Sequence, residues 1–394
     1  MKKIKAKFIL TPDKIIENGE ILFKRKIIKI GKNLPNTNKT YKFDLVMPAL
    51  INTHTHLEFS KNKTLLEYGD FITWLNSVIH HRENLFIECK GDCFKKAIDE
   101  MKRSGVCAFG EISSTGNDLK YLRHSPLKVV YFNEIVGSNP GAVDVLYTDF
   151  LSRLQSSLEL KSDKFHPAIS IHSPYSVHPI LMQKVLNIAR EKNLPIQAHF
   201  MESKAEREWL DRGEGDFKKF FEKIFPHAKP LISPKEFLYQ FRGLKTTFIH
   251  CVWANDEELD IIKNLNASIA HCPISNRLLN VGKLNLKKVM DKKIPFSVAT
   301  DGLSSNYSLN IFKELRAALF MHYEIDPNAL AKELIISVTK TAANSLNLNN
   351  GEIAPNKDVD LIAIKLPHTK SNIHLHTILH TNEVEKMFIN GEEI

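Results

Sequence analysis

Short apolar runs recur through the middle of the chain, each followed by a polar loop and a segment whose apolar residues have helical spacing. Segments such as Cys93–Arg103, Pro179–Glu191 and Glu257–Leu265 show that spacing. Eight alternating strand–helix units predict a distorted (β/α)8 TIM barrel over residues 48–345, although a doubly wound sheet would show the same alternation. The eight apolar runs are Val46–Ile51, Val106–Phe109, Val129–Phe132, Ala168–Ile171, Pro195–Ala198, Thr247–Ile249, Ser268–Ala270 and Phe296–Ala299.

The two ends of the chain have a different pattern, with short alternating runs separated by turn residues such as Asn18-Gly19 and Asn390-Gly391. This pattern predicts short antiparallel strands. Neither end is long enough to bury a good core of its own. We therefore predict that residues 1–47 and 346–394 pair into one small β-sandwich domain beside the barrel.

Composition narrows the range of partners. Apolar residues make up 43% and charged residues 25% of the 394, which is ordinary for a globular protein with a sizeable core. The net charge of +9 comes with lysines spread over the whole chain, so it indicates a basic solvated surface and no nucleic-acid partner. The longest apolar runs, about seven residues, are far shorter than the ~20 that span a membrane, so no membrane partner is expected.

The N-terminus and the cysteines predict that the protein is cytoplasmic. The apolar run Phe8–Leu10 is too short for the core of a signal peptide. The cysteines include no CxxC pair and are too scattered for a disulfide framework, so they predict free, mostly half-buried thiols. They are Cys89, Cys93, Cys107, Cys251 and Cys272.

Histidine and aspartate side chains follow several apolar runs, at the strand ends where barrel enzymes gather catalytic residues. The first run leads into Thr53-His54-Thr55-His56, and residues i and i+2 of a strand face the same side. The fifth run is followed by His199 and the eighth by Asp301. Three imidazoles and one carboxylate leave room for a water on a catalytic Zn²⁺ or Fe²⁺. We predict that His54, His56, His199 and Asp301 bind one divalent metal ion.

A second His-x-His pair provides a comparison. His374-Leu375-His376 lies in the C-terminal segment, with no acid or further histidine at a matching strand end. We expect these residues to lie on an exposed strand face. The spacing alone is therefore a weak signal for a metal.

Three further polar residues lie near the strand ends, and one of them, Glu202, suggests proton transfer. Glu202 lies three residues after His199, where a carboxylate can take a proton from an activated water and pass it to a substrate nitrogen. The alternative is a helix-opening glutamate favoured by the helix dipole. His250 follows the sixth run and is expected to stabilise the attacking hydroxide or the tetrahedral intermediate. For His271, after the seventh run, structural and active-site roles remain equally open.

These motifs resemble the amidohydrolase superfamily, specifically its mononuclear deaminase branch, over nearly the whole chain. The resemblance implies metal ligation by His54, His56, His199 and Asp301. It also implies proton transfer by Glu202, with His250 and Asp301 activating the water. The segments that carry it are Val46–His56, His199–Glu202, His250–Trp253, His271–Asn276, Thr300–Gly302 and Gly351–Leu361.

Within that branch the chain is similar to S-adenosylhomocysteine and 5′-methylthioadenosine deaminases. The resemblance implies that Trp74 lines the nucleoside pocket, Glu83 holds the ribose hydroxyls and His172 touches the substrate. An indole suits a purine face, and a carboxylate suits a vicinal diol. For Trp74 the alternative is a core residue of an amphipathic helix, and for Glu83 it is a solvated charge on a helix.

One departure concerns the substrate's 5′ substituent. Relatives that bind the amino-acid tail of S-adenosylhomocysteine use arginines after strand three, whereas Asn133–Leu151 contains no Arg or Lys. The segments Asp70–Leu75, Gly110–Ser114 and Asn133–Gly137 look most like aminodeoxyfutalosine deaminases of menaquinone biosynthesis. Their substrate has a carboxyphenyl-ketone tail, and its carboxylate needs a cation. The candidates are Arg82, Arg277 and His81.

The predicted reaction is hydrolytic deamination of an adenine nucleoside, most specifically 6-amino-6-deoxyfutalosine. Metal-bound hydroxide attacks C6, Glu202 carries the proton to N1, and ammonia leaves. Alternatives are deamination of S-adenosylhomocysteine, methylthioadenosine, adenosine or guanine, and, more remotely, a non-catalytic scaffold. The segment Ser203–Phe225 is expected to be either a lid or a plain surface insertion. The resemblance is compatible with a homodimer.

Overall fold

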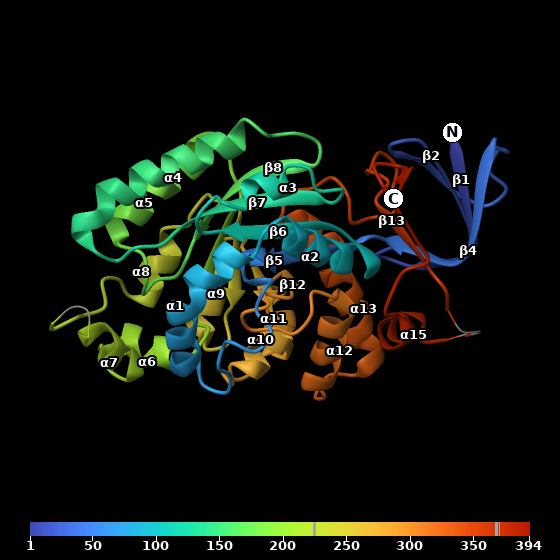
Figure 1. Cartoon of the computed structure of the whole chain (residues 1–394). Helices are drawn as coiled ribbons and strands as arrows, with labels where there is room; N and C mark the ends of the chain where they lie inside the picture. The colour runs from blue at the N-terminus through green and yellow to red at the C-terminus, as the bar shows by residue number, and fades with distance from the viewer. Residues whose placement is uncertain (224–225, 367–368, 370) are drawn as a thin grey trace.

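The computed structural model describes residues 1–394 except 224–225, 367–368 and 370. In that part of the chain, eight parallel strands form one sheet in sequence order, with helices around it (Figure 1). The prediction of a distorted barrel is confirmed. Its strands are β5 (Leu50–Thr55), β6 (Val106–Ser113), β7 (Lys128–Ile135), β8 (Phe165–Ile171), β9 (Ile196–Phe200), β10 (Thr246–His250), β11 (Ser268–His271) and β12 (Phe296–Val298).

The first predicted strand is divided between two sheets. The run Val46–Ile51 contains the end of β4 (Lys39–Pro48), which belongs to the terminal sheet, and the start of β5. At the junction, the backbone N–H of Ala49 donates to the carbonyl of Asp360. Pro48 has no N–H to continue a ladder, which is consistent with a break at this point.

Side chains join the first and last barrel strands. Asn52 Nδ2 donates to Thr300 Oγ1 at 2.7 Å, and the Thr300 N–H donates back to Asn52 Oδ1 at 3.1 Å. The Asp301 N–H donates to the carbonyl of His54 at 3.1 Å. This closure holds the C-terminal ends of β5 and β12 together.

Helices cover the outside of the barrel with apolar faces. In α2 (Gly91–Arg103), for example, Phe94, Ala97, Ile98 and Met101 are buried at helical spacing, and the helix packs on β6. The remaining α-helices are α1 (Phe71–Glu88), α3 (Leu119–Leu122), α4 (Val143–Leu158), α5 (Pro179–Lys192), α6 (Lys204–Arg212), α7 (Asp216–Glu222), α8 (Pro234–Tyr239), α9 (Asp256–Asn264), α10 (Pro273–Leu278), α11 (Leu286–Asp291), α12 (Ile311–Met321), α13 (Pro327–Ser337), α14 (Lys340–Ser345) and α15 (Ile373–His380), with 3-10 turns η1 (Leu57–Phe59) and η2 (Pro140–Ala142). Among the described helices, none is long and apolar enough to cross a membrane.

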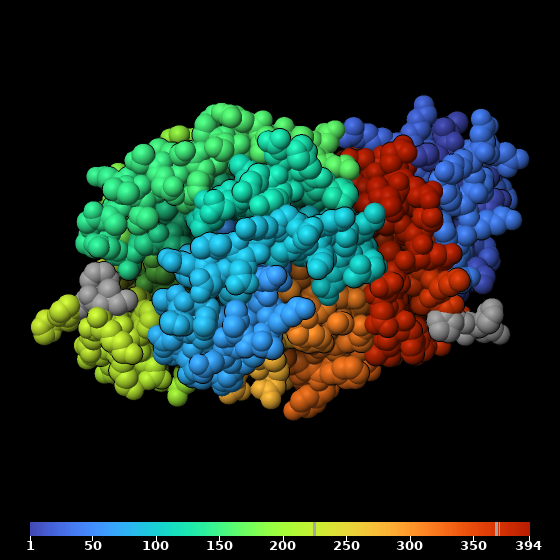
Figure 2. All heavy atoms as spheres, in the orientation of Figure 1, coloured from blue at the N-terminus to red at the C-terminus, as the bar shows by residue number. Residues whose placement is uncertain are grey.

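Both ends of the chain form one curled sheet with its own small core, which fits the small terminal domain of the predicted fold class. Phe23 and Phe388 lie on strands separated by three others, yet their ring centroids are 5.9 Å apart, so the sheet is strongly curled. C-terminal residues (red) lie between the N-terminal strands (blue) and the barrel (Figure 2). The strand order is β15 (Glu392–Glu393), β14 (Lys386–Ile389), β13 (Leu361–Ile364), β4, β1 (Lys2–Leu10), β2 (Ile15–Phe23), β3 (Ile27–Gly31).

The prediction for His374 and His376 was wrong. Both lie on helix α15, which packs against α13 and α12, and both are half-buried. Ile373, Thr377 and Ile378 are buried at helical spacing, so tertiary packing selects a helix here.

The prediction of free cysteines was wrong for one pair. Cys89 follows α1 and Cys93 lies in the first turn of α2, and the two form a disulfide. The tight connection between the two helices brings their Cα atoms to 5.2 Å, although no CxxC spacing signals it. Cys107, Cys251 and Cys272 are free but fully buried, not half-buried.

Candidate active site

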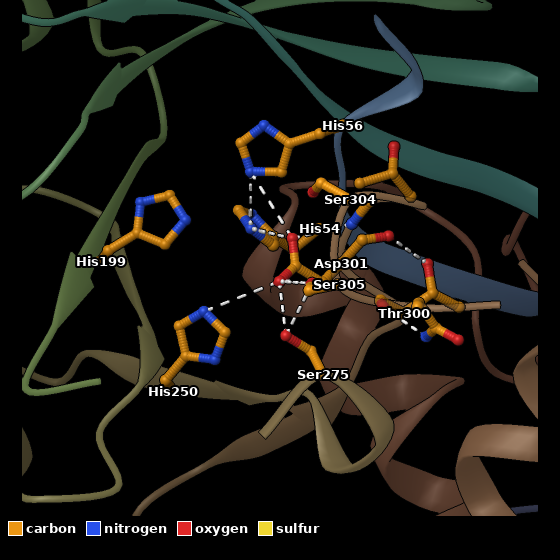
Figure 3. Close-up of polar contacts among 12 residues, drawn as sticks. His54, His56, His199, His250, Ser275, Thr300, Asp301, Ser304 and Ser305 are labelled. Carbon is orange, nitrogen blue, oxygen red and sulfur yellow. Dashed lines mark hydrogen bonds and ion pairs between the residues drawn. The ribbon is translucent and has the colours of Figure 1, made fainter. Parts of the chain in front are cut away.

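Three histidines converge at the C-terminal ends of β5 and β9 (Figure 3). One ring nitrogen from each of His54, His56 and His199 lies within 4.8 Å of the others, and His54 Nε2 is 3.2 Å from His56 Nε2. Burial lowers the pKa of His54 to about 4 and that of His199 to about 3, so both rings are neutral at pH 7. Neutral imidazoles present lone pairs, which is the form that binds metal.

Hydrogen bonds behind these rings fix which nitrogen is free. His54 Nδ1 donates to Gln197 Oε1 at 2.9 Å, and Gln197 Nε2 donates to the carbonyl of Thr53, which orients the amide. His199 Nδ1 donates to the carbonyl of His172 at 2.9 Å. Each ring therefore has its Nε2 lone pair facing the centre, an arrangement typical of metal-binding histidines.

Asp301 completes this cluster from the end of β12. Its Oδ1 lies 3.7 Å from Nε2 of both His54 and His56. The hydroxyls of Ser275 and Ser305 each donate to its Oδ2 at 2.8 Å. Burial alone would raise the pKa of Asp301, but the surrounding imidazoles lower it below its ordinary value. Its backbone is left-handed, with φ of 59°, a strained conformation of the kind found at functional sites.

The donor set of three imidazole nitrogens and one carboxylate oxygen suits a divalent transition metal. The structure thus brings together the four residues predicted as metal ligands. A second candidate group, Glu134, His172 and His199, shares a residue with the first. His199 has only one free ring nitrogen and can serve only one of the two groups at a time.

Glu202 and His250 lie beside the cluster and face each other. Glu202 Oε1 is 3.4 Å from His250 Nε2, which is 3.9 Å from Asp301 Oδ2. Burial, together with the neighbouring carboxylates of Asp301 and Glu206, raises the pKa of Glu202 well above its ordinary value. Such a carboxyl holds its proton more readily than an ordinary glutamate does, which suits a general acid.

The backbone before helix α6 fixes the position of Glu202. The carboxylate of buried Glu206, in the first turn of α6, accepts from the N–H groups of Met201 and Glu202 at 3.0 and 2.8 Å. Ser203 is the N-cap of α6, and its side chain accepts from the Glu206 N–H. Glu202 therefore precedes the helix and lines the cavity, which does not fit the helix-opening alternative.

His271 does not line the cavity, which answers the question left open by the sequence. It lies behind Asn276, whose Oδ1 accepts from His250 Nδ1 at 2.9 Å and whose Nδ2 is 3.5 Å from His271 Nδ1. His271 Nε2 is 3.0 Å from Nε2 of buried His322. Its place is structural, in a polar row that supports His250.

A cavity of about 290 Å³ opens beside the histidines. Trp74 covers part of its wall, and its Nε1 donates to the carbonyl of Ser304 at 2.8 Å. Phe220 and Phe221 also line the wall. They belong to the segment 203–225, for which the sequence leaves a lid and a plain surface insertion both open, and residues 224–225 of it lie outside the described part. Further apolar lining residues are Phe59, Leu75, Val78, Ile79, Phe86, Val136 and Tyr175.

Three of the residues predicted to bind substrate line the cavity, and two do not. Trp74, Arg82 and His172 line it, whereas Glu83 is exposed outside the lining and Arg277 is exposed on α10 beside Asn280. Glu83 is nine residues from Trp74 on one helix, which turns it about 180° away, while Arg82 remains on the cavity side. His81 is half-buried but does not line the cavity.

Arg82 is the only lysine or arginine among the described lining residues. Its guanidinium is 5.4 Å from the centre of the Phe86 ring and makes no hydrogen bond or ion pair within the described ranges. An unpaired cation on a mostly apolar wall suits an anionic group of a ligand.

Sequence reasoning assigned no role to Glu134, near the end of β7. It lines the cavity and is 2% exposed, and Ser114 Oγ donates to its Oε2 at 2.7 Å. Burial raises its pKa, while nearby His199 lowers it. The available signal was a glutamate near the C-terminal end of a predicted barrel strand.

Comparison with known proteins agrees with this geometry. A model described as the amidohydrolase family matches residues 45–394. The chain belongs to the amidohydrolase family. It is 47% identical over 403 residues to aminodeoxyfutalosine deaminase of a Nitratiruptor species, covering 100% of this chain and 99% of the relative.

Two proteins of Helicobacter pylori are also similar. An adenosine deaminase is 34% identical over 394 residues, covering 96% of this chain and 95% of the relative. The crystal structure of aminofutalosine deaminase in complex with methylthio-coformycin superposes with a TM-score of 0.95 at 32% identity, covering 100% of both chains. The predicted amidohydrolase resemblance, barrel fold and hydrolase class are confirmed.

Proposed function

We propose that this enzyme deaminates an adenine nucleoside by hydrolysis at C6. The observation that carries the proposal is the pairing of a buried carboxyl, Glu202, with His250 at 3.4 Å, directly beside a convergent set of metal-type donors. Hydrolytic deamination needs an activated water on one side of C6 and a proton for the adjacent ring nitrogen. Residues that would serve both requirements, among them His199, Glu202 and Asp301, line one cavity, which supports the proposal.

His54, His56, His199 and Asp301 would hold one divalent ion, Zn²⁺ or Fe²⁺. When bound, such an ion supplies Lewis acidity that lowers the pKa of a water molecule from 15.7 toward about 7. The single free nitrogen of His199 favours one ion over two. Metal analysis of purified protein tests this: about one equivalent is expected, and a metal-free but fully active enzyme would contradict it.

The chain's own groups then position the substrate and move the proton. Glu202 holds the proton and gives it to N1 of the purine, since its raised pKa favours the protonated form. His250 presents its Nε2 lone pair because Nδ1 is engaged by Asn276. Trp74 provides an apolar surface for the purine, and His172 contacts it from the end of β8.

The substrate we propose is 6-amino-6-deoxyfutalosine, with other adenine nucleosides as the alternatives. The relative at 47% identity is named for that activity, and Arg82 is the one unpaired lysine or arginine among the lining residues that the structure describes. The carboxylate of the aryl tail would pair with this guanidinium. The segment 133–151 has no arginine or lysine for an amino-acid tail.

A substrate panel tests the proposal. Ammonia release is measured for the wild type, Arg82→Ala and the comparison variant Arg277→Ala on aminodeoxyfutalosine, methylthioadenosine, S-adenosylhomocysteine, adenosine and guanine. We expect the highest kcat/KM for aminodeoxyfutalosine, lost selectively in Arg82→Ala by about 10- to 100-fold, the range of a charge-assisted hydrogen bond. Equal rates on aminodeoxyfutalosine and adenosine would contradict the assignment of the substrate but not of the reaction.

A further inference from the structure

Glu134 is a buried acid whose bonding is incomplete within the described structure. Ser114 Oγ donates to its Oε2 at 2.7 Å, but its Oε1 has no hydrogen-bond partner. Arg153 Nη2 donates to the backbone carbonyl of Glu134 at 3.0 Å, not to the carboxylate. A buried carboxylate oxygen without a donor is costly, so this arrangement is best satisfied by a donor from a ligand in the cavity that Glu134 lines.

The position of Glu134 places that donor close to the reaction centre. A carboxylate oxygen of Glu134 and ring nitrogens of His172 and His199 all lie within 4.8 Å of one another. His199 Nδ1 is already engaged, and His199 Nε2 faces His54 and His56. Glu134 therefore lies farther from the metal-donor cluster than the residues proposed to bind the metal. When the base of a ligand lies beside the metal-donor cluster, the group attached to that base lies next to Glu134.

The chemistry of a nucleoside restricts what this group is. The ring nitrogens of adenine accept hydrogen bonds, and its 6-amino group is at the reacting carbon. The remaining donors of an adenosine core are the ribose hydroxyls. A carboxylate accepts only, and Ser114 Oγ keeps acceptor capacity after donating to Glu134, so the pair suits a vicinal diol.

We propose that Glu134, oriented by Ser114, binds the ribose hydroxyls of the substrate and selects ribonucleosides over deoxynucleosides. This inference rests on the proposed deamination. It assigns to β7 the role that the family resemblance implied for Glu83, which is exposed outside the described cavity lining.

A substrate–variant cycle tests the assignment. The kcat/KM of wild type, Glu134→Gln, Ser114→Ala and Glu83→Gln is measured on adenosine, 2′-deoxyadenosine and 3′-deoxyadenosine, with thermal unfolding as the check on folding. The wild type is expected to prefer adenosine over at least one deoxynucleoside by about 10- to 100-fold. Glu134→Gln should lose that preference through a lower rate on adenosine alone, Ser114→Ala should lose part of it, and Glu83→Gln should keep it.

Two kinetic results would overturn the inference. In the first, Glu134→Gln lowers kcat/KM by the same factor on all three nucleosides, which would place its contact on the base. In the second, Glu83→Gln abolishes the preference instead. If folded, metal-loaded wild type deaminates none of the three, equilibrium dialysis of adenosine decides: weaker binding to Glu134→Gln supports the ribose site even though the reaction fails, and equal binding overturns it.

Discussion

A buried ion pair ties the N-terminal end of the barrel to the terminal sheet, and breaking it should destabilise the whole protein. Lys128, the first residue of β7, is 2% exposed, and its Nζ lies 2.6 Å from Asp360 Oδ2 and 3.3 Å from Asp358 Oδ2. Asp360 is 1% exposed and also accepts from Asn350 Nδ2 and the Asn390 N–H. Burial alone would lower the pKa of Lys128, but Asp360 raises it, so the lysine is charged in the folded state.

The substitution Lys128→Met keeps most of the apolar stem but leaves the carboxylate of Asp360 buried without its cation. The expected loss is about 3–5 kcal/mol of unfolding free energy, the range for removing one partner of a buried pair. Adding Asp360→Asn removes the stranded charge while keeping an oxygen for the Asn390 N–H, so the double variant should recover most of the loss. Because the pair lies at the opposite end of β7 from the cavity, kcat/KM at a permissive temperature should not change.

Urea unfolding of the wild type, Lys128→Met, Asp360→Asn and the double variant, followed by circular dichroism, measures the free energies of unfolding. The slopes with urea should agree, so that a shift in midpoint reports stability. The reasoning would be refuted if Lys128→Met lost less than about 1 kcal/mol, the value of an exposed pair. It would equally be refuted if the double variant were no more stable than the single one.

The remaining predictions concern the site and its supporting groups. Glu202→Gln should lower kcat by about 10²- to 10⁴-fold, the contribution of a positioned acid–base group, while metal content by mass spectrometry stays unchanged. His54→Ala, or chelator treatment of the wild type, should lose both metal and ammonia release; activity persisting after verified metal removal would contradict the site. Asn276→Leu should lower kcat more than it raises KM, because it frees His250 Nδ1 without touching the cavity wall. Burial raises the pKa of Glu314 to about 8, so its contribution to stability is complete below pH ~4.5 and is lost as the pH rises through about 8. Glu314→Gln should flatten the fall of the urea midpoint across that interval, and an unchanged pH profile would contradict this.

The sequence alone determined the features that depend on local periodicity. Eight apolar runs with helices between them predicted the alternation of strands and helices, because strand and helix spacing follow directly from backbone geometry. This alternation left a doubly wound sheet open, and the polar residues at the strand ends favoured the barrel. A pair of histidines at i and i+2, with further polar residues at other strand ends, located the donor cluster, since the C-terminal ends of parallel barrel strands share one face. For His54, His56, His199 and Asp301, proximity follows from topology.

Only the tertiary structure decided which residues support or surround that cluster. Gln197 acts from β9, and Ser275 and Asn276 act from α10. No spacing rule links them to the His54 ring, the Asp301 carboxylate and the His250 ring that they contact. The disulfide between Cys89 and Cys93 depends on the connection between α1 and α2, which brings the two Cα atoms to 5.2 Å.

The residues that face the substrate side of the cavity could likewise not be predicted from spacing in the sequence. Periodicity identifies the faces of α1 but not how the helix is rotated over the barrel mouth, and that rotation directs Arg82 inward and leaves Glu83 in solvent. Glu134 faces the cavity because β7 closes into a barrel whose interior side is set by its neighbours. The local sequence pattern determines which element forms and which of its residues share a face. Packing against distant elements determines how that element is rotated, and this rotation decides which side chains reach a ligand.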